Sequence, residues 1–598
     1  MQAHFLLGPA GSGKTFRCRA EIRAALLAAP DGPPLILLAP KQATFQLERQ
    51  LLADPALPGY TRLHILSFER LAQFVLDRLR LAPPTTLSEE GRVMVLRALL
   101  RQRQGELQIF RAAARLTGFA QQLSLLLREF QRHRLSPSQL AELSARPDNP
   151  TPLRAKLHDL ALLLHAYGDW LDAHDLRDAN HLLDVAASAL RPAPSALRIS
   201  GLWLDGFAEM TPQELELLVA LLPLCEQATL AFCLEGEPPA DPSWLSPWSV
   251  VAHTFHRCHA RLANRKDGNV TVETLAPPPD AGRFAGNKTL AALEANWSRP
   301  ASLALTPGFS PGSEGGDVIK SVATASGSAS LRLALCANPE SEAVLAAREI
   351  RRHVRNGGRF RDCAIIVRRL ESYHATIARV FRRYEIPFFM DQREAAAHHP
   401  LTELTRFAVR TVAFGWRHDD WFGALKSGLV SPNAEAIDEL ENQALARGWE
   451  GKVWRVTLSI ANENDTGKRL EKLRQQILPP FESLTTALAE NSSAPNGTEV
   501  AAAIRELWRA LDVEATVARW SQNSAGQLAF HTAVLEQMQD WLANLERAFP
   551  VESLSLRDWL PILEAGLANL TVGVVPPALD QVLIGAIDRS RNPELRLA

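Results

Sequence analysis

Short apolar runs alternate with helical patterns in the first part of the chain and again near residue 200. The apolar runs are HFLL (4–7), PLILLAP (34–40), LHILSF (63–68), LRISGLWLDGF (197–207) and ATLAFCL (228–234). Strands that alternate with helices are typical of a parallel sheet covered on both faces. We therefore expect one α/β core made of residues 1–84 and 191–235.

Apolar residues at helical spacing fill the segment between these two parts. Leu116, Phe119, Leu123, Leu126 and Phe130 follow one another at steps of three and four residues. One apolar stripe per helix is typical of a helical bundle. The pattern predicts a helical insert over residues 85–190 that splits the first core.

The second half repeats this organisation. Proline- and glycine-rich stretches predict an irregular region and linker over 236–330. Apolar runs such as DCAIIVR (362–368) and DQVLIGAIDRSR (580–591) predict strands of a second α/β core. Its expected ranges are 331–400 and 570–598, with a second helical insert over 401–569.

Composition narrows the class of protein. The chain has 598 residues, 46% of them hydrophobic, and a net charge of -1, so any nucleic-acid contact must come from local patches. The six cysteines form no CxxC pair, which favours reduced thiols in a cytoplasmic protein. The N-terminus has no signal-peptide pattern, and no apolar stretch approaches the roughly 20 residues that span a bilayer.

The clearest chemical motif is GPAGSGKT, which matches the phosphate-binding pattern GxxxxGK[ST] in full. Glycines allow backbone N–H groups to surround phosphate oxygens, and the helix that follows adds its positive end. Lys14 is expected on the β- and γ-phosphates, and the Thr15 hydroxyl on Mg²⁺. The expected nucleotide-binding residues are Gly8, Gly11, Ser12, Gly13, Lys14 and Thr15.

An aspartate follows a second apolar strand far along the chain. Asp205 ends the run LWLD, at the carboxyl end of a strand, where ligands of open α/β sheets bind. We expect Asp205 and Thr15 to bind Mg²⁺ together. The long insert before Asp205 suits a helicase-type motor better than a small nucleotide kinase.

The position after this aspartate lacks an acid. Hydrolysis of ATP needs a group that orients the attacking water, and helicase-like ATPases usually have Glu directly after the magnesium Asp. Gly206 stands there in this chain, and Glu209 and Glu214 are the nearest acids that follow. The sequence does not tell whether either of them reaches the phosphate.

Two further groups of polar residues are candidates for binding. Residues 348–383 hold eleven arginines against three acids, so this segment can attract DNA phosphates or a partner. Arg368, Arg589 and Arg591 each come just after an expected strand and are the candidate DNA contacts. The string HTFHRCH (253–259) has metal-like composition, but helical geometry turns its side chains to different faces, which favours an ordinary helix.

Several strings together resemble the AddB family, the second subunit of bacterial AddAB helicase–nucleases. They include GPAGSGKT, LLAPKQATFQLERQLL, LHILSFERLAQFV, LWLDGFAEMTPQELELL, IPFFMDQREAAAHHPL and PPALDQVLIGAIDRSR. The resemblance covers most of the chain and is weakest over 236–330. It implies a superfamily 1 helicase architecture with two RecA-like P-loop cores, ATP between them and DNA across them.

The resemblance also implies a function. AddB subunits bind ATP, double-stranded DNA ends and single-stranded DNA, and they act with an AddA-type subunit in repair of double-strand breaks. They are regarded as lacking motor activity, which agrees with Gly206 and with the absence of room for a glutamine motif before Gly8. An active ATP-driven translocase, and a P-loop protein unrelated to DNA, are the alternatives.

The chain departs from the family pattern in one respect. Family members carry a C-terminal nuclease and an iron–sulfur cluster held by four cysteines. Neither a nuclease triad nor clustered cysteines are found in these 598 residues. We therefore expect a fragment that covers the helicase-like part of a longer protein.

Overall fold

The computed structural model divides into two compact units. The first contains Met1–Pro83, Leu182–Asp391 and Ala578–Ala598, and the second contains Pro84–His181 and Gln392–Pro577. The structure describes residues 2–41, 43–55, 57, 59–116, 118–191, 197–264, 269–277, 287–298, 307–308, 318–322, 331–390, 393–461, 464–490, 494–521, 525–573, 580–587 and 595–598. The two units are described separately below.

A parallel sheet of six strands forms the main part of the first unit. Its strand order is β3-β2-β6-β7-β1-β8. The strands are β1 (Gln2–Gly8), β2 (Leu35–Leu38), β3 (Leu63–Leu66), β6 (Ile199–Leu204), β7 (Cys225–Cys233) and β8 (Asn269–Thr274). All their pairings are parallel, so the carboxyl ends of the strands meet at one edge.

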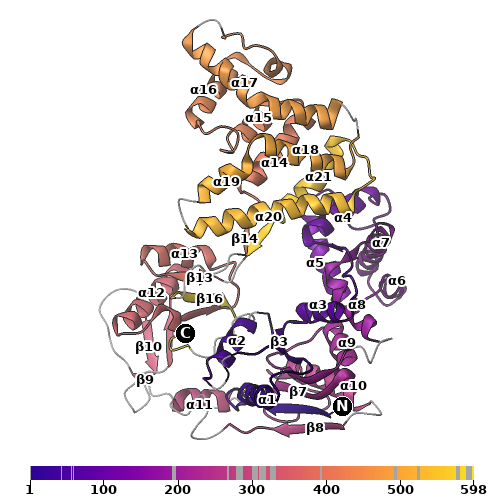
Figure 1. Ribbon diagram of the computed structural model, residues 1–598, viewed down its shortest axis with the longest axis vertical. Helices are drawn as coiled ribbons and strands as arrows, with labels where there is room; N and C mark the ends of the chain where they lie inside the picture. The colour runs from indigo at the N-terminus through magenta and orange to yellow at the C-terminus, as the bar shows by residue number, and fades with distance from the viewer. Residues whose placement is uncertain are drawn as a thin grey trace. The chain divides into compact units, whose positions relative to one another are not determined.

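Helices cover both faces of this sheet. They are α1 (Lys14–Ala28), α2 (Thr44–Leu52), α3 (Phe68–Arg78), α8 (Leu182–Leu190), α9 (Pro212–Leu221) and α10 (Ser249–Ala263). Phe5 and Leu7 of β1 pack with α3, α8, α9 and α10, whereas Leu6 packs with α1 and α2. Successive side chains of a strand point to opposite faces, so β1 contributes to both cores. Figure 1 shows α9 and α10 beside β7.

The segment 236–330, expected to be an irregular linker, supplies regular elements to this unit. It contains α10, β8 and α11 (Lys288–Ala295), and β8 extends the sheet by pairing with β1. β8 lies at the sheet edge, and each of its side chains is exposed or half-buried. A strand with no fully buried residue has no continuous apolar run, which is why the sequence pattern did not indicate it.

A second, smaller parallel sheet has the order β12-β16-β13. It consists of β12 (Ala364–Val367), β13 (Phe388–Met390) and β16 (Val582–Ala586), with α12 (Pro339–Arg355) and α13 (His374–Arg383) packed against it. The strand expected at 580–591 is β16, and it lies between the other two. The run SLRLALCA forms β11 (Leu331–Leu335), which pairs antiparallel with β10 (Val318–Val322) in a separate sheet that β9 (Pro307–Gly308) completes.

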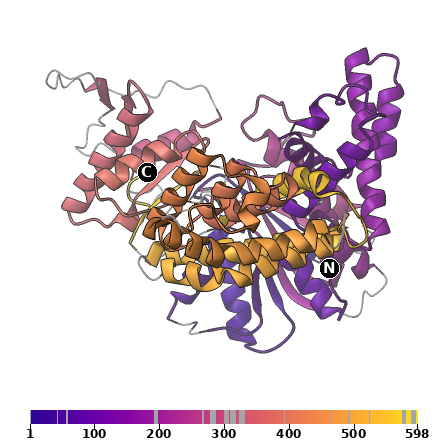
Figure 2. The ribbon, with the colours of Figure 1, turned by 90° about the horizontal axis from the view of Figure 1, so that it is seen from above.

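The second unit is mainly helical and draws on both segments that were expected as separate inserts. Its helices are α4 (Glu89–Gln102), α5 (Phe119–Arg132), α6 (Pro137–Ala145), α7 (Thr151–Ala173), α14 (Pro400–Ala413), α15 (His418–Leu425), α16 (Ala434–Arg447), α17 (Asp465–Thr485), α18 (Gly497–Ala510), α19 (Val513–Ser521), α20 (Ala525–Ala548) and α21 (Leu556–Leu567). Two short strand pairs, β4 (Thr86–Leu87) with β5 (Arg177–Asp178) and β14 (Arg393–Ala395) with β15 (Thr571–Gly573), accompany them. Figure 2 shows the orange and yellow helices between residues 400 and 567 gathered in one bundle.

Specific contacts join the two helical segments into one core. The rings of Trp170 and Phe549 lie 5.4 Å apart, and His174 Nε2 lies 2.8 Å from the carboxylate of Glu552. α4 packs against α20 and α21. Because α8 packs on the six-stranded sheet instead, the helical unit ends at His181, earlier than the expected boundary at 190.

Candidate nucleotide-binding site

The phosphate loop connects β1 to α1 at the carboxyl edge of the six-stranded sheet. β1 ends at Gly8 and α1 begins at Lys14. Gly11 and Gly13 have φ angles of 80° and 94°, a left-handed conformation that side chains disfavour. The first turn of α1 contains no acidic residue, so its positive end is not compensated from within the helix. This geometry suits an anion-binding loop.

The ammonium group of Lys14 lies inside the loop. Its Nζ donates to the carbonyl oxygens of Gly8 and Pro9 at 2.6 and 2.8 Å, and to Ser12 Oγ at 3.3 Å. Burial lowers the pKa of Lys14, while the neighbouring charges of Asp205 and Glu294 act in the opposite direction. The ammonium group of Lys14 therefore lies within the loop that the sequence predicts to bind phosphates.

The structure brings Thr15 and Asp205 together. Thr15 Oγ1 donates a 2.7 Å hydrogen bond to Asp205 Oδ2, although the two residues are 190 positions apart. Asp205 follows β6, and Thr15 lies in the first turn of α1, which follows β1. Because β7 lies between β6 and β1 in the sheet, the contact between Thr15 and Asp205 crosses one strand. A hydroxyl and a carboxylate at this distance, beside a phosphate loop, are oxygen donors of the kind that Mg²⁺ binds together with phosphates. The described residues contain no group of three or more His, Cys, Asp or Glu side chains that could hold a metal.

One half-buried acid, Glu21, fixes α1 against the sheet behind the loop. Glu21 accepts hydrogen bonds from Trp203 Nε1 at 2.9 Å and from Thr229 Oγ1 at 3.0 Å, and it pairs with Arg17. Burial raises the pKa of Glu21, but these hydrogen bonds outweigh it, and the pKa is lowered overall. Trp203 lies on β6, two residues before Asp205. The hydrogen bond from Trp203 to Glu21 therefore fixes α1 relative to the strand that Asp205 follows.

The structure shows the surroundings of Gly206 and of the two acids that follow it. Gly206 has a φ of 89°, so the chain turns in a left-handed conformation directly after Asp205. Glu209 is exposed. Glu214 accepts the backbone N–H of Thr211 at 2.7 Å and also its hydroxyl, so it closes the first turn of α9.

One further acid near the loop is Glu294 on α11, which the sequence pattern did not indicate. The backbone N–H of Ala10 and the charge of Lys14 act to lower the pKa of this carboxyl group. Burial outweighs both, so the pKa of Glu294 is raised above its ordinary value. Glu294 belongs to the segment 236–330, which has no clear apolar pattern. The sequence therefore contains no motif that points to Glu294.

Only one of the three candidate DNA contacts, Arg368, belongs to the described residues. Arg368 is exposed and follows β12, at the carboxyl end of the smaller sheet. Arg589 and Arg591 lie outside the described residues. In the basic segment, Arg352 pairs with Glu349 and Arg379 with Glu340.

The HTFHRCH string lies on α10, and its polar side chains have separate surroundings. Cys258 is 1% exposed in the core, the His259 ring packs 5.4 Å from that of Phe5, and His256 Nε2 lies 2.7 Å from the carbonyl oxygen of Pro239. These residues serve the packing of α10 on the sheet.

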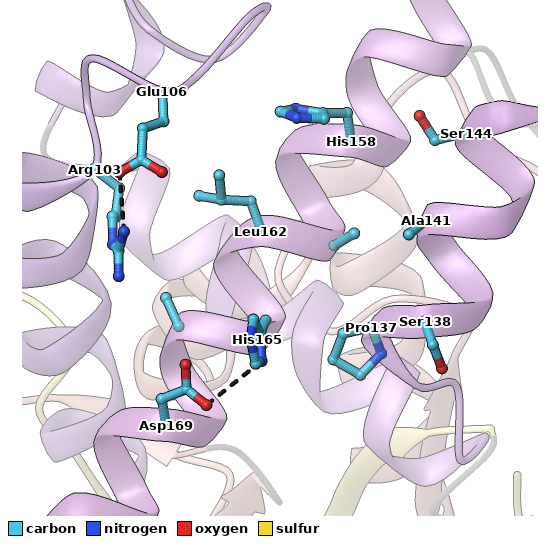
Figure 3. A pocket seen from close by; sticks show the side chains of 12 residues that line it. Arg103, Glu106, Pro137, Ser138, Ala141, Ser144, His158, Leu162, His165 and Asp169 are labelled. Carbon is cyan, nitrogen blue, oxygen red and sulfur yellow. Dashed lines mark hydrogen bonds and ion pairs between the residues drawn. The ribbon is translucent and has the colours of Figure 1, made fainter.

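A hollow of about 710 Å³ opens in the helical unit between one face of α6 and one face of α7 (Figure 3). Leu162 and small apolar side chains line it, together with the ion pairs Arg103–Glu106 at 3.0 Å and His165–Asp169 at 3.4 Å. None of the residues expected to bind nucleotide or DNA belongs to its lining.

Comparisons with known proteins place the chain in a family. The model for the N-terminal part of AddB matches residues 5–294. Proteins named as the B-type subunit of an ATP-dependent helicase/deoxyribonuclease, from Moorella thermoacetica and Desulforudis audaxviator, are each 34% identical to this chain, and one from Pelotomaculum thermopropionicum is 33% identical. Each match covers 100% of this chain and 52% of the relative.

These relatives define a class, the B-type subunits of ATP-dependent helicase/deoxyribonucleases. The chain belongs to the AddB family, which confirms the resemblance drawn from its motifs. It spans about half the length of the curated relatives that it matches. Within the described residues, no helix combines the length and apolar character needed to cross a membrane.

Proposed function

We propose that this chain is the helicase-like part of an AddB subunit that works with an AddA-type partner on DNA double-strand breaks in the bacterial cytoplasm. In this proposal its two parallel sheets are the RecA-like cores of a superfamily 1 helicase architecture. The chain binds ATP and Mg²⁺ at the phosphate loop and turns ATP over slowly or not at all. Double-stranded ends and single-stranded DNA are its substrates within the complex.

The contact between Thr15 and Asp205 is the observation that carries the nucleotide-binding part of this proposal. A phosphate loop without a magnesium-binding acid would be a weak indication, but here both halves of the site lie within hydrogen-bond distance. Lys14 would hold the β- and γ-phosphates, and Thr15 and Asp205 the metal. The metal would neutralise phosphate charge and fix the triphosphate, while the protein positions both.

Slow turnover is supported by the residues that follow Asp205. Gly206 carries no side chain, and the Glu214 carboxylate caps the start of α9. An active ATP-driven translocase is the alternative, and it requires another acid to orient the water.

DNA binding is proposed for the exposed arginines, with Arg368 at the carboxyl edge of the smaller sheet as the first candidate. Cationic side chains bind the DNA backbone without regard to sequence. Arg589 and Arg591 remain candidates from the sequence.

The iron–sulfur cluster of the family does not fit the cysteines of this chain. All six are thiols, four of them are buried, and no cluster of ligands forms among the described residues. We assign no step to such a cluster.

Equilibrium binding of a non-hydrolysable ATP analogue tests the nucleotide proposal. The wild-type chain should bind it in a magnesium-dependent manner, Lys14→Ala should abolish binding, and Asp205→Ala should remove the magnesium dependence. Magnesium-independent binding that survives Lys14→Ala would refute it.

A further inference from the structure

The first turn of α1 carries an exposed aromatic ring beside the phosphate loop. Phe16 follows Thr15 directly, and its side chain is 75% exposed. The buried stripe of α1 consists of Cys18, Ile22 and Leu26, which pack in the core beneath the helix. At 3.6 residues per turn, Phe16 lies about 200° around the helix from Cys18, on the face that turns away from this core. The ring therefore contributes little to the packing that holds the site together.

The backbone of Phe16 belongs to the groups that can bind a phosphate. The first hydrogen bond from α1 back to the loop runs from the Arg17 N–H to the Gly13 carbonyl oxygen, at 2.8 Å. The N–H groups of Lys14, Thr15 and Phe16 precede it, and a helix leaves such donors without a partner in its own backbone. In phosphate loops these N–H groups bind the α- and β-phosphates. Phe16 is the last residue of this series, so it brings a backbone donor and an aromatic ring to the same end of the site.

The order of the polar groups indicates where the base of a nucleotide would lie. Lys14, inside the loop, and the contact of Thr15 with Asp205 define the end at which the β- and γ-phosphates and Mg²⁺ would bind. The α-phosphate would then lie at the last of the backbone donors. Because a single ribose joins the α-phosphate to the base, the base would leave the loop beside Phe16.

We propose that Phe16 is a platform on which the base of the bound nucleotide stacks. This inference rests on the proposed function and extends it, because it makes the ligand a whole nucleoside triphosphate rather than a phosphate chain alone. Aromatic side chains stack on nucleobases of every kind, since each base has a π face. A phenylalanine ring offers no hydrogen-bonding group, so Phe16 adds affinity for a purine without selecting adenine over guanine.

The test compares three variants of the full chain with the wild type. Phe16→Ala removes the ring, and Phe16→Tyr keeps it. Leu27→Ala is the matched control, because Leu27 is a second exposed apolar residue of α1, 52% exposed and about 16 Å further along the helix. Each protein is titrated by calorimetry, with Mg²⁺ present, with a non-hydrolysable ATP analogue, the corresponding GTP analogue and inorganic tripolyphosphate. Tripolyphosphate presents the phosphate chain without a base.

We expect Phe16→Ala to raise the Kd of both nucleotide analogues about tenfold, which corresponds to about 1.4 kcal/mol. Its Kd for tripolyphosphate should equal that of the wild type, because the loop itself is unchanged. Phe16→Tyr and Leu27→Ala should bind all three ligands as the wild type does. Since Phe16 is exposed, Phe16→Ala should also keep the urea unfolding midpoint of the wild type.

Four results would contradict this account in distinguishable ways. Equal affinities of wild type and Phe16→Ala for the ATP analogue would remove the platform and leave nucleotide binding intact. An equal loss of affinity for tripolyphosphate in Phe16→Ala would mean that the ring shapes the loop instead of binding the base. Weaker DNA binding by Phe16→Ala, with unchanged affinity for the analogues, would assign the ring to a DNA surface. Failure of the wild-type chain to bind any of the three ligands would refute the proposed function itself.

Discussion

Placing an acid at position 206 tests whether the missing glutamate alone limits turnover. Asp205 is held by a 3.0 Å hydrogen bond from its N–H to the Leu38 carbonyl and by the hydroxyl of Thr15. Gly206 then turns the chain with a φ of 89°. In this region an L-residue costs roughly 1–2 kcal/mol more than glycine, because its Cβ crowds the following carbonyl. In Gly206→Glu the backbone at position 206 therefore either keeps this φ angle with strain or moves to another conformation.

Three variants separate strain from chemistry. Gly206→Ala and Gly206→Glu should each lower the free energy of unfolding of the first unit by about 1–2 kcal/mol. Gly236→Ala is the control, since Gly236 has no positive φ and a Cβ there meets nothing within 4 Å. This control should be neutral or stabilising by roughly 0.4–1 kcal/mol, because alanine restricts the unfolded chain.

Urea unfolding followed by tryptophan fluorescence measures these differences, and a coupled assay measures ATP turnover with single-stranded DNA. We expect no gain of turnover in Gly206→Glu, because the strained turn does not direct its carboxylate at the γ-phosphate. A Gly206→Glu variant that is as stable as wild type and hydrolyses ATP rapidly would refute this reasoning.

Other predictions concern both units. Asp159, fully buried, accepts three backbone N–H groups of residues 108–110, so Asp159→Ala should cost about 2–4 kcal/mol in urea unfolding. Burial and the neighbouring His531 lower the pKa of His399 to about 4. The unfolded chain then binds the proton first, so stability should fall by about 2–3 kcal/mol as the pH drops from about 6.5 to about 4. His399→Asn, which keeps a helix cap, should remove the part of this loss that comes from His399. Arg368→Ala should reduce the salt dependence of DNA binding by about one phosphate contact, whereas Arg379→Ala, whose guanidinium is already paired with an acid, should change it less.

The parts of the site that are local in sequence could be predicted from it. A phosphate loop needs glycines, a lysine and a hydroxyl within eight residues, and its strand and helix have strong apolar patterns. Asp205 could be predicted because a buried strand delivers it to the same edge as Gly8, and its contact with Thr15 agrees with that expectation. The α/β class followed from the same alternation.

Features set by long-range packing could not be predicted. Apolar stripes show which face of a helix is buried but not its partner, so the packing of Trp170 against Phe549 was not foreseen. β8 has no continuous apolar run, and its place beside β1 is set by backbone pairing between distant parts of the chain. The φ of Gly206 depends on how β6 meets the following turn, which composition does not reveal.

The fate of bound ATP tests the central claim most directly. The chain is mixed with ATP labelled at the γ-phosphate, Mg²⁺ and single-stranded DNA, and the protein-bound nucleotide is separated and identified over time. Our account predicts that wild type retains intact ATP, and that Lys14→Ala retains none. Rapid conversion of the bound ATP to ADP and phosphate, stimulated by DNA and lost in Lys14→Ala, would contradict it.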